Sequence, residues 1–141
     1  MSTSTTDSAI LDRLEDLISR VFRHLAARTG GETGLSLSQR LVLRALSQSR
    51  MQVSDVAATL GVTLSAATGL IDRMARAGLV TRERDRGDRR VVWVRLTQEG
   101  RQALAAVDEA RRQAVAQAVS RLSSGEVEQL LTLLERVETG T

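Results

Sequence analysis

The chain contains no cysteine, lysine, proline or tyrosine, and it has one phenylalanine, one tryptophan and one histidine. The missing cysteine excludes structural disulfides, thiolate zinc sites and oxidation sensing by a thiol. The scarcity of aromatic residues leaves a core of leucine, valine and alanine. No apolar run approaches about 18 residues and no basic-then-apolar leader is present, which argues against membrane insertion or secretion and predicts a cytoplasmic protein.

The sequence shows no machinery for catalysis. An acid-base or nucleophilic site needs titratable groups paired near an apolar pocket. Here the carboxylates fall on the outward faces of predicted helices, and His24 is the only histidine. Nothing near His24 supports a metal site. We therefore expect a binding protein rather than an enzyme, without a metal or a cofactor.

The chain has 20 arginines and no lysine, against 17 acidic residues, so the formal net charge is +3. Arginine binds phosphate in a bidentate manner and keeps its charge, so the bias fits a nucleic-acid partner, although it fits a GC-rich genome equally well. A non-specific DNA coat protein would be far more basic. Positive charge is therefore expected to be local to one part of the surface.

A capping box, Ser36-x-x-Gln39, predicts the start of a helix that runs to about Ser47. Its inward residues are expected to be Leu37, Leu41, Leu43 and Leu46. Three arginines punctuate this helix and its exit: Arg40, Arg44 and Arg50. Because charged side chains are mostly exposed, we expect these three to be solvated rather than bound to phosphate.

The segment Val53 to Thr97 has the pattern of a winged helix-turn-helix. A short helix is expected to begin after Ser54 and end at Gly61, and Thr63 is placed to cap the next helix. The spacing i, i+3, i+4, i+7 gives that second helix a buried stripe of Ala67, Leu70, Ile71 and Met74. The side chains turned outward are Ser65, Ala66, Thr68, Gly69, Asp72, Arg73 and Arg76. Small residues at the N-terminal end of this face would let the helix enter the major groove of DNA.

After Gly78 the periodicity changes from helical to alternating. Residues 92–96 read as a strand with one apolar face, and residues 79–84 supply its partner. The tip between them contains the candidate contacts Arg86, Asp88, Arg89 and Arg90. Between Arg82 and Arg95, six arginines accompany three acidic residues. This local excess of positive charge on a projecting hairpin suits a polyanion.

Amphipathic helices are predicted at both ends of the chain. The first spans about residues 7–28 and is closed by the Gly30-Gly31 pair; another follows Thr97 to about Leu122, and the Ser123-x-x-Glu126 capping box opens the last. Inward positions of the second of these include Val107, Ala114, Val115 and Leu122, and the last has the stripe Val127, Leu130, Leu131, Leu134 and Val137. These faces exceed what a small head can cover, which predicts a twofold homodimer with interlocked terminal helices.

Other interpretations of these patterns exist. A helix-turn-helix occurs in many proteins as plain packing, and a charged hairpin is usually only solvated. The two elements in adjacent order favour a DNA-reading head. The alternative is a winged-helix protein-interaction module without sequence-specific DNA binding, and binding to random duplex DNA at low salt distinguishes the two.

In these motifs the chain resembles the MarR family of bacterial transcription regulators over nearly its whole length. The matching positions are Leu35 to Gln39, Val56-Ala57, Leu60 to Thr63, Leu70 to Met74, Gly78 to Val80, Asp88 to Arg90, Leu96-Thr97 and Gly100. In the family, the arginine of the Asp-x-Arg motif enters the minor groove and the aspartate holds it, which implies these roles for Arg90 and Asp88. Many relatives carry a long polar or basic side chain at the position of Gly69. Base readout is therefore expected to depend on other residues of the helix and on groove shape.

The resemblance implies a mainly α fold with a small β wing. A DNA-binding domain at residues 35–97 would be flanked by dimerisation helices at residues 1–34 and 98–141, with the paired heads in successive major grooves, half-sites lying roughly 34–36 Å apart. The expected function is repression or, less often, activation from an operator. The resemblance implies release by a small aromatic or anionic effector, whose pocket the sequence does not identify, and a ligand-free, constitutive regulator is the alternative. The candidate contacts with double-stranded DNA are Ser54, Thr63, Ser65, Ala66, Thr68, Gly69, Arg73, Arg86, Asp88, Arg89 and Arg90.

Overall fold

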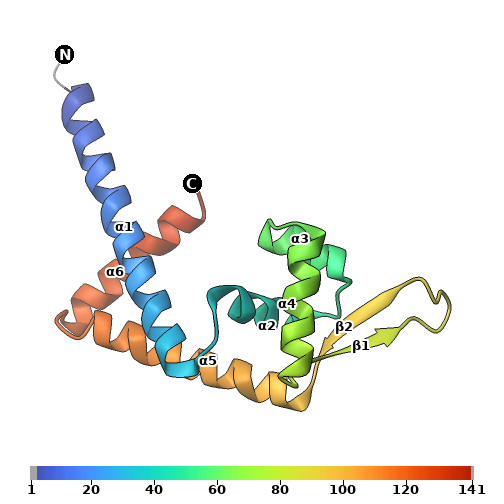
Figure 1. The fold of residues 1–141 in the computed structure, drawn as a ribbon. Helices are drawn as coiled ribbons and strands as arrows, with labels where there is room; N and C mark the ends of the chain where they lie inside the picture. Colours follow the sequence, from blue (N-terminus) through green and yellow to red (C-terminus); the bar gives the residue numbers. More distant parts are fainter. Residues whose placement is uncertain (1–2, 141) are drawn as a thin grey trace.

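The computed structural model describes residues 3–140, with side chains from Asp7 onward. The described residues form six α-helices and a two-stranded antiparallel sheet (Figure 1). In chain order the elements are α1 (Thr3–Thr33), α2 (Leu37–Gln48), α3 (Val53–Leu60), α4 (Leu64–Arg76), β1 (Val80–Arg84), β2 (Val92–Leu96), α5 (Gln98–Ala118) and α6 (Ser124–Glu138). The fold is therefore mainly α with a small β wing, as the sequence predicts.

One apolar core lies where α2, α3, α4 and the sheet meet, and we call the elements from α2 to β2 the head. Its largest fully buried side chains are Val42, Leu43, Val56, Ile71, Met74 and Val94. Helix α5 adds Leu104 to the same cluster. Burial of each such side chain contributes roughly 1.5–3 kcal/mol, so the head is held together mainly by aliphatic packing.

The turn between α3 and α4 follows from local features that the sequence predicts. Gly61 ends α3 in the left-handed conformation, with a φ of 66°, which a residue without a Cβ atom adopts at little cost. The Thr63 hydroxyl accepts a hydrogen bond from the Ala66 N–H at 3.1 Å and so caps α4. The predicted stripe of Ala67, Leu70, Ile71 and Met74 is buried.

The start of α3 differs from the prediction. The N-cap is Gln52, whose backbone N–H donates to the Asp55 carboxylate at 2.9 Å, and Ser54 lies exposed within the first turn. Met51, just before this helix, exchanges backbone hydrogen bonds of 3.2 and 2.7 Å with Val94 of β2. These bonds hold the backbone at Met51 extended, so α3 begins after it. This isolated bridge is the contact that the segment before α3 makes with β2.

Helix α1 is longer than the sequence predicts. It passes through Gly30 and Gly31 and ends before Gly34, whose φ is 68°. Gly30 allows close approach rather than ending the helix, because a Cβ atom there would lie 2.7 Å from the guanidinium of Arg40.

Arg40 is buried, with 8% of its surface exposed, although the sequence suggests a solvated side chain. Its Nη1 donates to the Leu35 carbonyl and its Nη2 to the Ala26 carbonyl, both at 3.0 Å. Arg44 is half-buried and forms an ion pair with Asp108 of α5. Two arginines of α2 therefore tie the head to α1 and α5.

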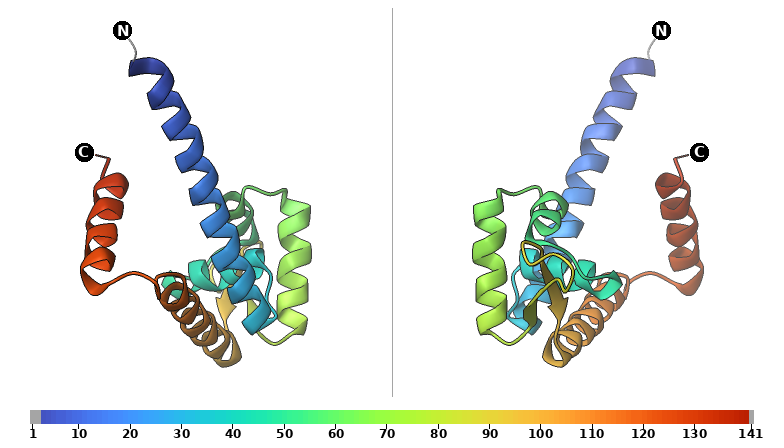
Figure 2. Two further views of the ribbon diagram at one scale, coloured as in Figure 1. Left: turned by 90° about the vertical axis from the view of Figure 1, so that its left-hand side faces the viewer. Right: turned by 90° about the vertical axis from the view of Figure 1, so that its right-hand side faces the viewer.

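The terminal helices extend away from the head, on the side opposite the wing (Figures 1 and 2). Thr97 caps α5 as predicted, but this helix ends at Ala118 rather than near Leu122. The predicted capping box of Ser123 and Glu126 opens α6, and no residue of α6 is buried.

Much of the predicted inward surface remains uncovered within one chain. Leu37, Leu41, Val115 and Leu122 were expected to face inward, yet each remains exposed, because the other described elements cover these side chains only in part. The large exposed apolar residues of the terminal helices are Ile10, Leu11, Leu14, Leu17, Ile18, Val21, Phe22, Leu130, Leu131, Leu133, Leu134 and Val137. Helices α1 and α6 therefore each carry an exposed apolar face.

Within residues 3–140 no single helix is long and apolar enough to cross a membrane. Only α3 and α4 together reach that composition, with a bend of 110° between them, and their apolar side chains form the core of the head. The described part of the chain also contains no group of three His, Cys, Asp or Glu residues that could hold a metal ion.

Gly100, in the first turn of α5, gives a test of this packing. An added Cβ atom would lie 2.1 Å from the Leu79 carbonyl oxygen. We expect Gly100→Ala to lower the free energy of unfolding by about 1–3 kcal/mol, the range for overpacking. The control Gly125→Ala, where nothing lies within 4 Å of the added atom, should leave it unchanged or raise it by up to about 1 kcal/mol. Urea denaturation followed by circular dichroism measures both, and equal midpoints would contradict the close approach.

Candidate nucleic-acid interface

The outward face of α4 is small and polar at its N-terminal end. Ser65, Ala66 and Thr68 are exposed there, as the helical spacing predicts, and Gly69 is half-buried. The Thr68 hydroxyl donates to the Leu64 carbonyl at 2.9 Å, which leaves its methyl group and an oxygen lone pair directed outward. This end of the helix therefore presents a low surface that a DNA groove can approach closely.

Arg73, in the last turn of α4, is a long exposed side chain on this face. A Cβ atom at Gly69 would lie 3.5 Å from Arg73 Nη1, so the guanidinium folds back over the glycine one turn earlier. The space next to Gly69 is thus occupied by the guanidinium of Arg73. Donors for a base edge remain available even though residue 69 has no side chain.

The wing is a hairpin attached to the head along one edge. Strand β1 pairs with β2 in antiparallel register, from Val80 opposite Leu96 to Arg84 opposite Val92. The bridge between Met51 and Val94 joins β2 to the segment before α3. The far end of the hairpin projects beyond helices α2, α3 and α4 (Figure 1).

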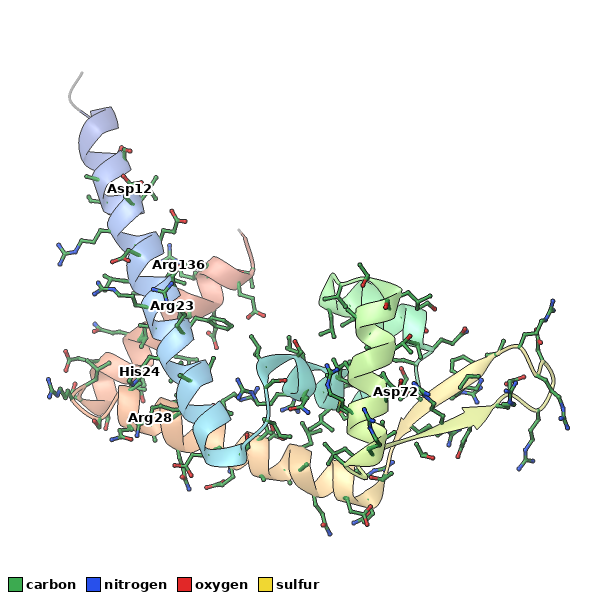
Figure 3. All side chains as sticks on the ribbon, in the orientation of Figure 1. Asp12, Arg23, His24, Arg28, Asp72 and Arg136 are labelled. Atoms are coloured by element: carbon green, nitrogen blue, oxygen red, sulfur yellow. The ribbon has the colours of Figure 1, made fainter. Side chains whose placement is uncertain are left out.

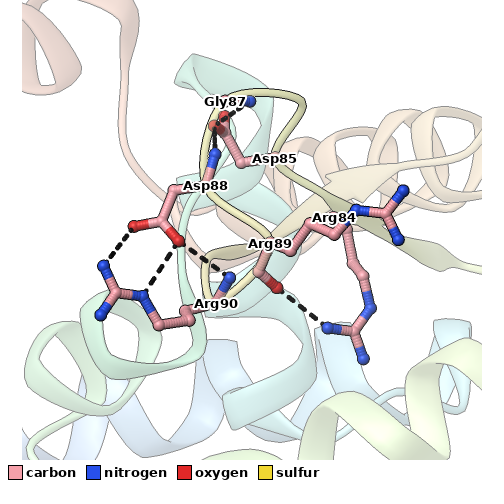
Figure 4. A network of polar contacts seen from close by, with 6 residues as sticks. All are labelled: Arg84, Asp85, Gly87, Asp88, Arg89 and Arg90. Carbon is pink, nitrogen blue, oxygen red and sulfur yellow. Dashed lines mark hydrogen bonds and ion pairs between the residues drawn. The ribbon is translucent and has the colours of Figure 1, made fainter.

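Hydrogen bonds fix the tip of the wing. The Asp85 Oδ2 atom accepts from the backbone N–H groups of Gly87, at 2.9 Å, and Asp88, at 3.0 Å. Asp88 in turn accepts from three groups of Arg90: the backbone N–H at 3.0 Å, Nε at 3.2 Å and Nη2 at 3.3 Å (Figure 4). The structure therefore brings together the two residues of the Asp-x-Arg motif.

The arginines of the tip remain open to solvent. The side chain of Arg90 is 91% exposed despite its contact with Asp88, and Arg86 and Arg89 are exposed as well. The Arg89 carbonyl accepts from Arg84 Nη1 at 2.9 Å, which places a further guanidinium beside the tip (Figure 4). Cationic groups thus gather at the end of the hairpin.

Two arginines of β1 belong to the same surface and were not among the predicted contacts. Arg82 forms an ion pair of 2.5 Å with Asp72 of α4, whose side chain lies on the wing side of that helix (Figure 3). A cleft of about 410 Å³ separates α4 from the wing and is lined by Val53, Thr68, Arg82, Arg84 and Val92. Residues two apart lie on the same face of a strand, so the alternating pattern of the sequence could have placed both arginines on one face of β1.

Two of the predicted DNA contacts, Thr63 and Ser54, differ from the others in their surroundings. The Thr63 hydroxyl accepts the bond that caps α4, which leaves its proton and one further lone pair available for other contacts. Ser54 is exposed at the start of α3, outside the helix face formed by α4.

A short helix, a tight turn, a longer helix with a polar outward face and a basic two-stranded hairpin define a winged helix-turn-helix protein. A sequence model of the MarR family matches residues 33–91. The chain is also 40% identical over 68 residues to the HTH-type transcriptional regulator YfiV of Bacillus subtilis strain 168. That match covers 48% of this chain and 42% of YfiV, so the chain spans less than half of that relative's length.

Solved structures agree over most of the chain. A MarR family protein from Bacillus stearothermophilus superposes with a TM-score of 0.81 at 25% identity, covering 94% of this chain and 96% of that one. A MepR-like protein complexed with pseudoligands is 31% identical, with a TM-score of 0.61 and coverage of 93% of each chain. The chain belongs to the MarR family, whose members are transcription regulators and not enzymes.

The wing-tip contacts predict a pH dependence. The hydrogen bond from Trp93, followed by those from the Asp88 and Gly87 backbone, holds the pKa of Asp85 below its ordinary value of 3.8. A lowered pKa stabilises the folded wing above pH 3.8, and this contribution is lost as the pH falls through the lower folded-state pKa. We expect the fluorescence of Trp93 to titrate with a midpoint below 3.8, and Asp85→Asn should abolish that step. A midpoint above 3.8 would contradict the assigned contacts.

Proposed function

We propose that this chain binds double-stranded DNA in a sequence-dependent manner as a homodimer and regulates transcription from an operator. The supporting observation is that one rigid head carries both a low, polar face on α4 and a fixed, exposed Asp88–Arg90 pair at the wing tip. A helix of this kind fits the major groove, and a guanidinium at the end of a hairpin fits the minor groove next to it.

The phosphate backbone would cross the cleft between α4 and the wing. Arg82, Arg84 and Thr68 line that cleft, so bidentate phosphate contacts from the two arginines are available between the two grooves. Such contacts carry no sequence information, whereas Ser65, Thr68 and Arg73 would contact base edges. Affinity should therefore decline steeply with salt concentration.

Arg90→Ala tests the wing assignment. We expect operator affinity to fall by about 1–3 kcal/mol and the slope of log affinity against log salt to decrease in magnitude by about 1, because one phosphate-proximal cation is removed. The matched control is Arg112→Ala, which removes the same charge from α5, where the side chain is 77% exposed and paired with Glu109. Gel-shift titrations at several salt concentrations measure both variants. An Arg90 variant that binds like the control would remove the wing from the interface.

The homodimer is supported by the uncovered apolar faces of α1 and α6. A soluble protein rarely exposes an apolar surface of this extent without a partner. Two copies related by a twofold axis would cover the same patch on each other and place two heads on one side of the assembly. The proposed domain division follows: residues 35–97 read DNA, and residues 1–34 and 98–141 dimerise.

Ile18→Glu tests this dimer. Light scattering should give about twice the chain mass of 15.3 kDa for the unmodified protein, and the variant should dissociate because a buried, unpaired carboxylate is costly at an apolar interface. Asp16→Ala, on the polar face of the same helix where the carboxylate pairs with Arg20, should remain dimeric. A monomeric unmodified protein would contradict the proposal directly.

We further propose that a small aromatic or anionic effector releases the DNA and that the regulator is a repressor. A cavity of about 310 Å³ lies where α1, α2 and α5 meet, lined by Phe22, Leu25, Ala26, Thr29, Leu37, Arg40, Leu41, Arg44, Val107, Arg111 and Val115. Its apolar wall suits a ring, and its arginines suit a carboxylate. Since the cavity touches both the head and the terminal helices, a ligand that prefers one head position would shift the spacing of the two heads.

A protein-interaction module is the competing function. The observation in its favour is that Val62 and Leu64, at the turn beside the N-terminus of α4, are exposed apolar residues. Binding of random duplex DNA at low salt separates the two functions. A DNA regulator binds such duplexes through phosphate contacts, whereas an interaction module does not.

A further inference from the structure

Trp93 lies on the face of β2 opposite the head's core and contacts the wing tip. Its indole Nε1 donates a hydrogen bond of 3.0 Å to Asp85 Oδ1. The guanidinium carbon of Arg50 lies over the face of the same ring, 4.0 Å from its centroid. A cation at this distance from the face of an indole is attracted to it. The ring therefore joins the loop after α2 to the turn of the wing.

Asp85 uses both carboxylate oxygens. Oδ1 accepts from Trp93, while Oδ2 accepts from the backbone of Gly87 and Asp88, which sets the path of the turn. An aspartate at this position commonly bonds only to its own turn. Here Oδ1 accepts instead from Trp93, eight positions later in the chain.

The contacts continue from this turn to the exposed arginine. Asp88, placed by its backbone bond to Asp85, holds the backbone N–H, Nε and Nη2 of Arg90. An unbroken series of contacts thus runs from Arg50 on the head through Trp93 to Arg90 at the tip.

A two-stranded hairpin needs such an anchor. Isolated hairpins of two strands are marginally stable in water. This hairpin has five residues in each strand, and its tip projects beyond helices α2, α3 and α4 (Figure 1). An unanchored tip would have to be ordered on binding, which weakens affinity.

We propose that Trp93 and Asp85 are positioning residues that preset the wing tip, so that Arg90 reaches DNA in its binding conformation. The proposal rests on the DNA-binding function proposed above. Neither residue need touch DNA, since both act through Asp88 and the backbone of the turn.

Trp93→Phe tests the proposal, because it keeps an aromatic ring for Arg50 and removes only the N–H donor. We expect DNA affinity to fall about three- to tenfold, corresponding to one net hydrogen bond. The salt slope should stay unchanged because no charge is removed, in contrast to Arg90→Ala. Asp85→Ala should weaken binding at least as much, and it carries the same test if the phenylalanine variant does not fold.

A double-mutant cycle separates positioning from general stability or direct contact. In an Arg90→Ala background, Trp93→Phe should change affinity by less than twofold, because the group it positions is absent. An unchanged affinity for the single Trp93 variant, or full additivity with Arg90→Ala, would overturn the proposal.

A measurement without DNA keeps this proposal distinct from the function on which it rests. In ¹⁵N spectra, the Arg90 Nε–H signal, assigned by its loss in Arg90→Ala, should be protected from solvent exchange in the unmodified protein. Trp93→Phe should accelerate that exchange, whereas Arg112→Ala should not. If the unmodified protein fails to bind random duplexes, the DNA-binding function fails; unaltered Arg90 exchange in Trp93→Phe defeats the positioning role alone.

Discussion

Burial of one apolar stripe on α4 is the constraint on which the rest of the interface depends. Ala67, Leu70, Ile71 and Met74 are removed from water in the core that α4 shares with α2, α3, β1 and β2, and this packing leaves the low polar face of α4 pointing outward. The same core contains Val94, so the strand that carries the wing is fixed by the packing that orients α4. Helix and wing consequently keep a constant relation, which is needed if they are to enter neighbouring grooves together.

Helix α2 connects this head to the remainder of the chain through charged groups in an otherwise aliphatic structure. Arg40 donates to the Ala26 carbonyl of α1 and to the Leu35 carbonyl before α2, and Arg44 pairs with Asp108 of α5. A guanidinium has several donors in a fixed plane, so one side chain can hold two backbone segments at once. The cavity proposed for an effector adjoins both arginines. A ligand there would therefore act on the joint between the head and the terminal helices.

Local patterns predicted local structure well. The Ser36 and Ser123 capping boxes, the Gly61 exit, the Thr63 cap and the stripe of α4 depend on residues within one or two helical turns, and all were confirmed. Contacts between distant residues could not be read from periodicity. Burial of Arg40, the ion pair of Arg82 with Asp72 and the bond from Trp93 to Asp85 arise only when separate elements meet. The Ser54 cap was wrong for a similar reason, because the bridge between Met51 and Val94 decides where α3 begins. The DNA contacts themselves stay predictions.

The most direct test of the account is selection of bound fragments from a random duplex library with the purified full chain, followed by alignment of the selected sequences. Two heads on one symmetric assembly predict an inverted repeat whose half-sites are about 10–10.5 base pairs apart from centre to centre. An A·T-rich, narrow minor groove should flank each half-site where the wing arginines enter. Selection of a single asymmetric half-site, or of no common sequence, would contradict the account.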